Sequence, residues 1–144
     1  MTDDGFEGGC LCGAIRYRAS APPVRGVMCH CSMCRRHSGA PALAFVHFAV
    51  AAFAWRSVEP RWYRSSPFAE RGFCPDCGST LAMREEVLAD RVQICVGSLD
   101  QPDAVTLDDH VWTRERISWF DTRDELPRFA ESSSAVPSKA HDDT

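Results

Sequence analysis

Cys74-Pro-Asp-Cys77-Gly78 is the stretch of sequence that decides the fold. Two cysteines separated by two residues and followed by glycine form a turn whose backbone amides can point at both sulfurs, while the glycine takes a positive φ. Such a turn supplies two of the four thiolates of a closed zinc site. The sequence therefore predicts a hairpin built around a metal ion, and two further thiolates must come from elsewhere in the chain.

Seven of the eight cysteines fall into three clusters, of which Cys10-Leu-Cys12 is the first and Cys29-His-Cys-Ser-Met-Cys34 is the second. Cys10 and Cys12 are the only pair whose use leaves the middle cluster intact. We therefore expect a structural zinc site that supplies folding free energy, about 10 kcal/mol for such ions. Its ligands are Cys10, Cys12, Cys74 and Cys77.

The middle cluster places Cys29, Cys31 and Cys34 within six residues, in what we expect to be a short loop, and offers no fourth thiol. Three protein ligands leave a zinc ion with an open position, which is typical of catalytic sites. A zinc ion with three thiolates suits an incoming soft thiol, which binding converts to thiolate near neutral pH. The cluster therefore predicts activation of a sulfur nucleophile.

A structural alternative for the middle cluster is a second closed zinc site, in which a histidine supplies the fourth ligand. Water or a substrate thiol could equally fill that position. His37 is the best histidine candidate, because His30 lies between two ligands and His47 belongs to a predicted strand. The sequence leaves these possibilities open.

Length, charge and hydropathy narrow the class of protein. The 144 residues, of 16.0 kDa, fit one domain over residues 1–130, followed by a polar segment over residues 131–144 that is predicted to be disordered. The net charge is -4 with no basic stripe, which argues against nucleic acid binding. No apolar run approaches the roughly 18 residues needed to cross a membrane, and the acidic start of the chain lacks a signal core. We expect a soluble cytoplasmic protein with reduced, metal-binding thiols.

Period-two patterns and β-branched residues predict short strands, and no long helical periodicity is present, so the sequence favours an all-β fold. The segment 51–55 could begin a short helix or continue the sheet. The predicted strands cover residues 14–19, 42–48, 62–64, 71–74, 79–84 and 91–97.

Three further features are open to a structural or a functional reading. Cys95 lies in an apolar strand and is predicted to be a buried thiol, because a reactive thiolate needs an electropositive, accessible setting. Arg35 and Arg36 could meet a carboxylate of a ligand near the metal or lie solvated on the surface. The four tryptophans are expected in or near the core.

Four motifs together resemble the glutathione-dependent formaldehyde-activating enzyme family, which includes centromere protein V. The similarity runs from about Gly8 to Phe129 and includes all seven clustered cysteines. The motifs are Gly9-Cys-Leu-Cys-Gly-Ala-Ile-Arg-Tyr17, Cys29-His-Cys-Ser-Met-Cys-Arg-Arg36 followed by Ser38-Gly-Ala40, Arg71-Gly-Phe-Cys-Pro-Asp-Cys-Gly-Ser79, and Gly97-Ser-Leu-Asp100.

The resemblance implies a zinc-stapled β-tent fold with two zinc ions per chain, a structural ion on Cys10, Cys12, Cys74 and Cys77 and a more labile ion on the middle cluster. It also implies a carbon-sulfur lyase that joins glutathione and formaldehyde to give S-hydroxymethylglutathione. On that basis the expected catalytic residues are Cys29, Cys31 and Cys34. A non-catalytic zinc module for protein interaction and a sulfoxide reductase using Cys95 are the alternatives; the oligomeric state is not predicted.

Overall fold

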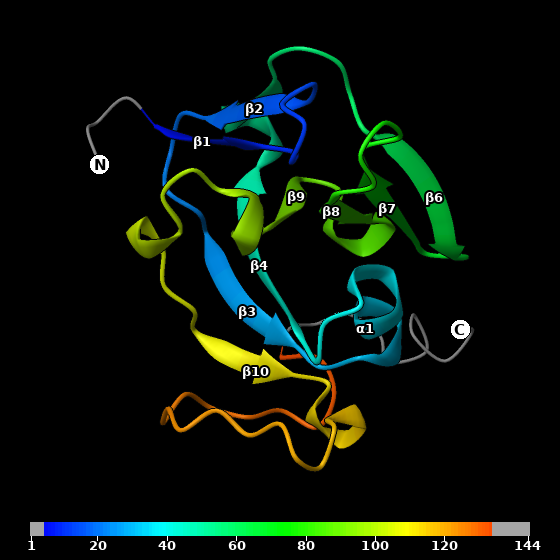
Figure 1. Cartoon of the computed structure of the whole chain (residues 1–144). Coiled ribbons are helices and arrows are strands. Elements are labelled where there is room, and N and C mark those ends of the chain that lie inside the picture. The colour runs from blue at the N-terminus through cyan, green and yellow to red at the C-terminus, as the bar shows by residue number, and fades with distance from the viewer. Residues whose placement is uncertain (1–4, 134–144) are drawn as a thin grey trace.

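Residues 5–133 of the computed structural model form two β-sheets and a short α-helix (Figure 1). The small sheet has the order β1-β2-β5, and the large sheet has the order β10-β3-β4-β9-β8-β7-β6. All neighbouring strands are antiparallel except β10 and β3. The predicted all-β fold class is therefore confirmed. The elements are β1 (Phe6–Gly9), β2 (Arg16–Ala19), β3 (Arg25–Cys29), α1 (Ser32–Ser38), β4 (Leu43–Ala49), β5 (Phe53–Trp55), β6 (Arg61–Ser66), β7 (Ala69–Phe73), β8 (Thr80–Glu85), β9 (Arg91–Cys95) and β10 (Asp109–Val111), with the single-turn 3-10 helices η1 (Val50–Ala52), η2 (Glu86–Leu88), η3 (Val96–Ser98), η4 (Pro102–Ala104) and η5 (Thr113–Glu115).

The alternating segments form strands in the structure because one face of each can be buried. In β2, Tyr17 and Ala19 are buried whereas Arg16 and Arg18 are only partly covered, as period-two alternation requires. The ambiguous segment 51–55 divides into the end of η1 and the strand β5. Figure 1 shows β1 and β2 at the top of the view and β10 at the bottom.

The large sheet is covered by apolar side chains on both faces. Between the sheets, Tyr17, Phe48 and Ile94 belong to one buried cluster. On the other face, Phe45 and Met83 belong to a second cluster that also contains Cys29, Cys31, Cys34 and Cys95. The middle cysteine cluster therefore lies inside an apolar core rather than on the surface.

The segment after β10 folds back along that strand. The backbone N–H of His110 donates to the carbonyl of Pro127, and that of Trp112 donates to the carbonyl of Glu131. Residues 134–144 of the predicted tail lie outside the described residues, and the domain boundary near residue 130 stays a prediction. Within residues 5–133, the helices are too short to cross a membrane.

Replacing Gly8 with alanine is expected to lower the free energy of unfolding by about 2 kcal/mol, because overpacking costs on this scale. A Cβ atom at Gly8 would collide with the Tyr17 hydroxyl and the backbone carbonyl of Ser98. Gly97→Ala is the matched control, since its Cβ meets nothing within 4 Å. Chemical denaturation of both variants measures the difference; equal stabilities would contradict the close approach of β1 to η3.

Candidate metal centres

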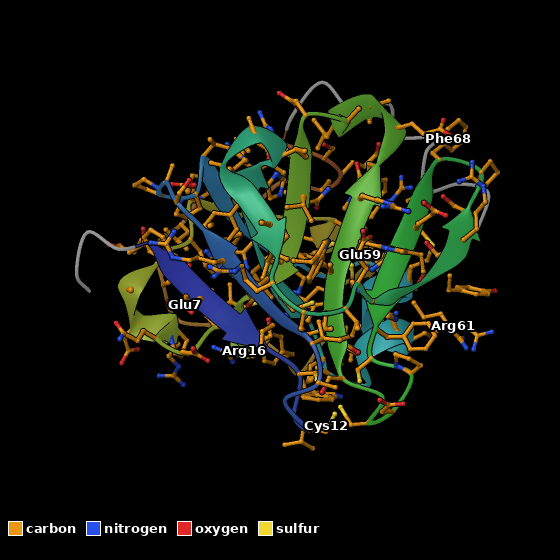
Figure 2. All side chains as sticks on the ribbon, turned by 90° about the horizontal axis from the view of Figure 1, so that it is seen from above. Glu7, Cys12, Arg16, Glu59, Arg61 and Phe68 are labelled. Carbon is orange, nitrogen blue, oxygen red and sulfur yellow. The ribbon has the colours of Figure 1, made fainter. Side chains whose placement is uncertain are left out.

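Two turns that are distant in sequence bring four sulfurs together. One turn joins β1 to β2 and carries Cys10 and Cys12, and the other joins β7 to β8 and carries Cys74 and Cys77. All four Sγ atoms lie within 4.8 Å of one another, with 3.6 Å between Cys10 and Cys12 and 3.8 Å between Cys12 and Cys74. Sulfurs bound tetrahedrally to one zinc ion at 2.3 Å lie about 3.8 Å apart. This group, hereafter the four-sulfur site, fits a zinc ion; Figure 2 shows Cys12 at the edge of the molecule.

Backbone amides support the sulfurs of the four-sulfur site. The N–H of Ile15 donates to Sγ of Cys10 at 3.3 Å, and the N–H of Cys77 donates to Sγ of Cys74 at 3.4 Å. Gly78 takes the expected positive φ of 79°. Hydrogen bonding with Ser79 lowers the pKa of Cys77 to about 6. These contacts stabilise thiolates, the form that metals bind.

The second group of sulfurs, hereafter the three-sulfur site, is formed by Cys29, Cys31 and Cys34. The Sγ atom of Cys34 lies 3.2 Å from that of Cys31 and 3.3 Å from that of Cys29. The segment is not the expected short loop. Cys29 ends β3, and Cys31 caps α1 by accepting a hydrogen bond from the N–H of Cys34 at 3.3 Å. Gly39 ends α1 with a φ of 73°, so this single short helix fixes two of the three sulfurs.

No fourth donor joins the three-sulfur site among the histidines, cysteines and carboxylates of residues 5–133. His47 lies on β4 and accepts a hydrogen bond from Arg91, and His30 contacts His110 instead. His37 lies on α1, and burial lowers its pKa to about 4, with Arg71 adding to the effect. The described residues therefore supply three sulfur ligands, a set that suits zinc with an open position.

Arg71 on β7 lies directly against the three-sulfur site. The residue is 1% exposed, and its Nη1 atom donates to Sγ of Cys34 at 3.2 Å. Its Nε atom donates to Ser65, and its Nη2 atom has no hydrogen-bond partner among residues 5–133. A buried guanidinium is costly unless an anion lies nearby, so this contact favours thiolate sulfurs. The sequence alone did not predict this role for Arg71, although its place in a strand that leads into the cysteine turn was an available signal.

His30, which lies between two residues of the three-sulfur site in the sequence, is held by a chain of polar contacts through His110 to Asp124. Its Nε2 atom lies 2.9 Å from Nδ1 of His110, and Nε2 of His110 lies 3.0 Å from Oδ1 of Asp124. The backbone N–H of His30 donates to the carbonyl of Val111. Burial lowers the pKa of His30 to about 4, with His110 adding to the effect. These contacts fix the residue between Cys29 and Cys31.

The remaining candidates take different places. Cys95 is 3% exposed, and burial raises the pKa of its thiol well above its usual range. Arg35 and Arg36 line a groove of about 300 Å³ together with Trp119, which is exposed rather than in the core. Cys95 is thus a buried thiol, as expected, while the arginines border a surface groove.

Comparison with known proteins assigns the family. The family model described as "Glutathione-dependent formaldehyde-activating enzyme" matches residues 5–115, a span that contains all seven clustered cysteines. The chain belongs to the glutathione-dependent formaldehyde-activating enzyme family.

One curated relative and one solved structure are similar to this chain. The chain is 38% identical over 76 residues to an uncharacterised lyase of Schizosaccharomyces pombe, and the match covers 53% of this chain and 55% of that protein. The chain thus spans about half the length of this curated relative. The crystal structure of a Rhodobacter sphaeroides protein superposes with a TM-score of 0.54 and 18% identity over 85% of this chain and 98% of that one, which shows a shared fold.

The two sulfur sites of this family member are expected to respond differently to loss of a ligand. Cys29→Ser should lower the metal content by one ion per chain and leave the fold intact, whereas Cys74→Ser should remove the other ion and lower stability by several kcal/mol. Elemental analysis and denaturation measure both effects. Cys95→Ser is the control and should keep both ions; a Cys29→Ser protein that also keeps both would contradict the assignment.

Arg71→Met is expected to weaken metal retention at the three-sulfur site only. Loss of an outer contact to a ligand typically costs tenfold or more in metal affinity, so a chelator should remove that ion about ten times faster. Arg61→Met, on the exposed part of β6, is the control. Equal chelation kinetics for the two variants would show that the Arg71 contact with Cys34 has no role in holding metal.

Proposed function

We propose that this chain is a zinc-dependent carbon-sulfur lyase-type enzyme that adds glutathione, or a related thiol, to formaldehyde or another small aldehyde. The product with glutathione and formaldehyde is S-hydroxymethylglutathione. The observation that carries the proposal is the three-sulfur site, in which Cys29, Cys31 and Cys34 converge without a fourth ligand from the described residues. Family membership and the name of the yeast lyase support the same reaction class. Two zinc ions per chain and a cytoplasmic location belong to the proposal.

The proposed reaction forms one carbon-sulfur bond and breaks the π bond of the aldehyde. The thiolate sulfur donates an electron pair to the carbonyl carbon, the π electrons move to oxygen, and that oxygen takes up the proton that the thiol has lost. A zinc ion on the three-sulfur site would supply an open position that favours the thiolate form of the incoming thiol. Formaldehyde needs little further activation, so positioning of the reactants supplies much of the rate.

The protein's own residues prepare this site in three ways. Cys31 and Cys34 are fixed by α1, and Cys29 is fixed by β3. Arg71 offsets the negative charge of the sulfurs from within hydrogen-bond distance of Cys34. The apolar cluster around Phe45 limits access of water, which strengthens these electrostatic contacts.

The two alternatives have less support. A non-catalytic zinc module would need two closed sites, yet the described residues provide a fourth donor only at the four-sulfur site. A sulfoxide reductase would need a reactive thiolate at Cys95, whose burial and raised pKa oppose that form. Thiol addition therefore agrees best with the geometry.

Exchange spectroscopy with ¹³C-formaldehyde and glutathione tests the proposal, because it measures the rate of adduct formation at equilibrium. The zinc-loaded protein should accelerate exchange at least tenfold over buffer, and Cys29→Ser should abolish the acceleration. Cys95→Ser should remain active, which separates thiol addition from redox chemistry at Cys95. Absence of acceleration with formaldehyde and with other small aldehydes would favour the interaction module.

A further inference from the structure

A narrow cavity of about 50 Å³ adjoins the three-sulfur site on the same face of the large sheet. Cys29 lines one part of it, and the side chains of Phe45 and Met83 contribute apolar walls. A cavity needs on the order of 10–15 Å³ to hold one water molecule. The cavity therefore admits a slender chain of a few atoms rather than a bulky group.

His47 and Gln93 line this cavity and carry buried polar atoms without partners. His47 is 5% exposed and Gln93 is 3% exposed. The Nε2 atom of each residue has no hydrogen-bond partner among residues 5–133. An unpaired buried donor costs about 1–3 kcal/mol. A ligand oxygen in the cavity would accept hydrogen bonds from this pair and so remove that cost.

The hydrogen bond from Arg91 determines which His47 nitrogen can donate. Arg91 Nη1 lies 3.3 Å from Nδ1 of His47, and a guanidinium only donates, so Nδ1 is the acceptor. Burial and the nearby arginines lower the pKa of His47 to about 4, which keeps the ring neutral. The remaining proton is therefore on Nε2. The cavity presents two N–H donors, one from His47 and one from the Gln93 amide.

Strand register places the two donors side by side and away from the sulfurs. His47 pairs with Gln93 across β4 and β9, and with Arg25 across β4 and β3. Arg25 precedes Cys29 by four residues along β3, which corresponds to about 13 Å at 3.3 Å per residue. A ligand with sulfur at Cys29 and oxygen at the donors must therefore be extended, with several bonds between the two atoms.

The charges that line the cavity do not demand a full negative charge on the ligand. Arg25 is already paired with Asp109 and contacts Ser133. Arg91 and Glu85 both line the cavity, and their charges have opposite signs. Either an amide carbonyl or a carboxylate oxygen can thus accept from the donor pair.

We propose that this cavity is the subsite for an acceptor oxygen of the thiol cosubstrate, bound by His47 and Gln93. His47 and Gln93 then favour a slender thiol with a carbonyl or carboxylate oxygen several bonds from its sulfur over a simple thiol of the same length. This inference rests on the proposed function, because it takes the thiol sulfur to lie at the three-sulfur site.

Thiols of equal chain length test the subsite in the cobalt-substituted protein, whose thiolate absorption bands report binding directly. The probes are 6-mercaptohexanamide, 6-mercaptohexanoate and hexanethiol. The amide or the carboxylate should bind about fivefold to tenfold more tightly than hexanethiol, and comparison of the two identifies the preferred oxygen. Gln93→Leu should remove this advantage and leave hexanethiol binding unchanged, whereas Gln101→Leu, at an exposed position, should keep it.

Equal affinity of the three probes in the cobalt-loaded protein of wild-type sequence would overturn the subsite. An advantage of the amide or carboxylate that survives in Gln93→Leu would also overturn it. If Gln93→Leu does not fold, Gln93→Met removes the same donor with a different shape. If neither variant folds, or if no thiol perturbs the cobalt spectrum, the NMR signal of the Gln93 side-chain amide in the protein of wild-type sequence decides whether the subsite exists. That signal should shift on titration with acetamide or acetate, and an unmoved signal would overturn the subsite. A silent cobalt spectrum with a shifted Gln93 signal would contradict the proposed function alone.

Discussion

The convergence of Cys10 and Cys12 with Cys74 and Cys77 is the constraint on which the rest of the structure depends. Cys12 and Cys74 are 62 positions apart in the sequence, and their turns belong to different sheets. An exposed ion pair also joins Arg16 on β2 to Asp100, which follows η3. Exposed pairs contribute at most about 1 kcal/mol. Structural zinc contributes on the order of 10 kcal/mol. A metal ion at this point would therefore fix the small sheet over the apolar cluster that contains Ile15 and Tyr17.

With the sheets fixed, the opposite face of the large sheet is free to form the three-sulfur site. The apolar cluster around Phe45 buries Cys34, and Arg71 supplies the positive charge that buried thiolates require. The ring of His30 is held by a hydrogen bond with the ring of His110. The two sulfur sites thus differ in the number of ligands that they offer, because two turns bring four sulfurs to one site and residues 5–133 bring only three to the other.

The sequence predicted the parts of the fold that depend on local patterns. Alternation identified β2, and cysteine spacing identified both sulfur groups. The strands β1, β3 and β10 were missed. Phe6-Glu-Gly-Gly9 has low strand propensity, Arg25-Gly-Val-Met-Cys29 has a glycine in its interior, and Asp109-His-Val111 is too short to show a period. The helix α1 spans only seven residues and is stabilised by the Cys31 cap rather than by an apolar stripe.

The contacts that escaped prediction join residues that are distant in the sequence. Arg71 and Cys34 are 37 residues apart, and His30 and His110 are 80 residues apart. His47 and Gln93 become neighbours only through the register of β4 and β9. No local pattern encodes these pairings, because they depend on the topology of the sheet.

The zinc environment measured by X-ray absorption tests the central claim most directly. One four-sulfur and one three-sulfur site predict an average of about 3.5 sulfurs per zinc, rising to about 4 when glutathione is added. An average that glutathione leaves unchanged, with outer-shell scattering from a bound imidazole, would contradict the account by showing that a histidine closes the second site.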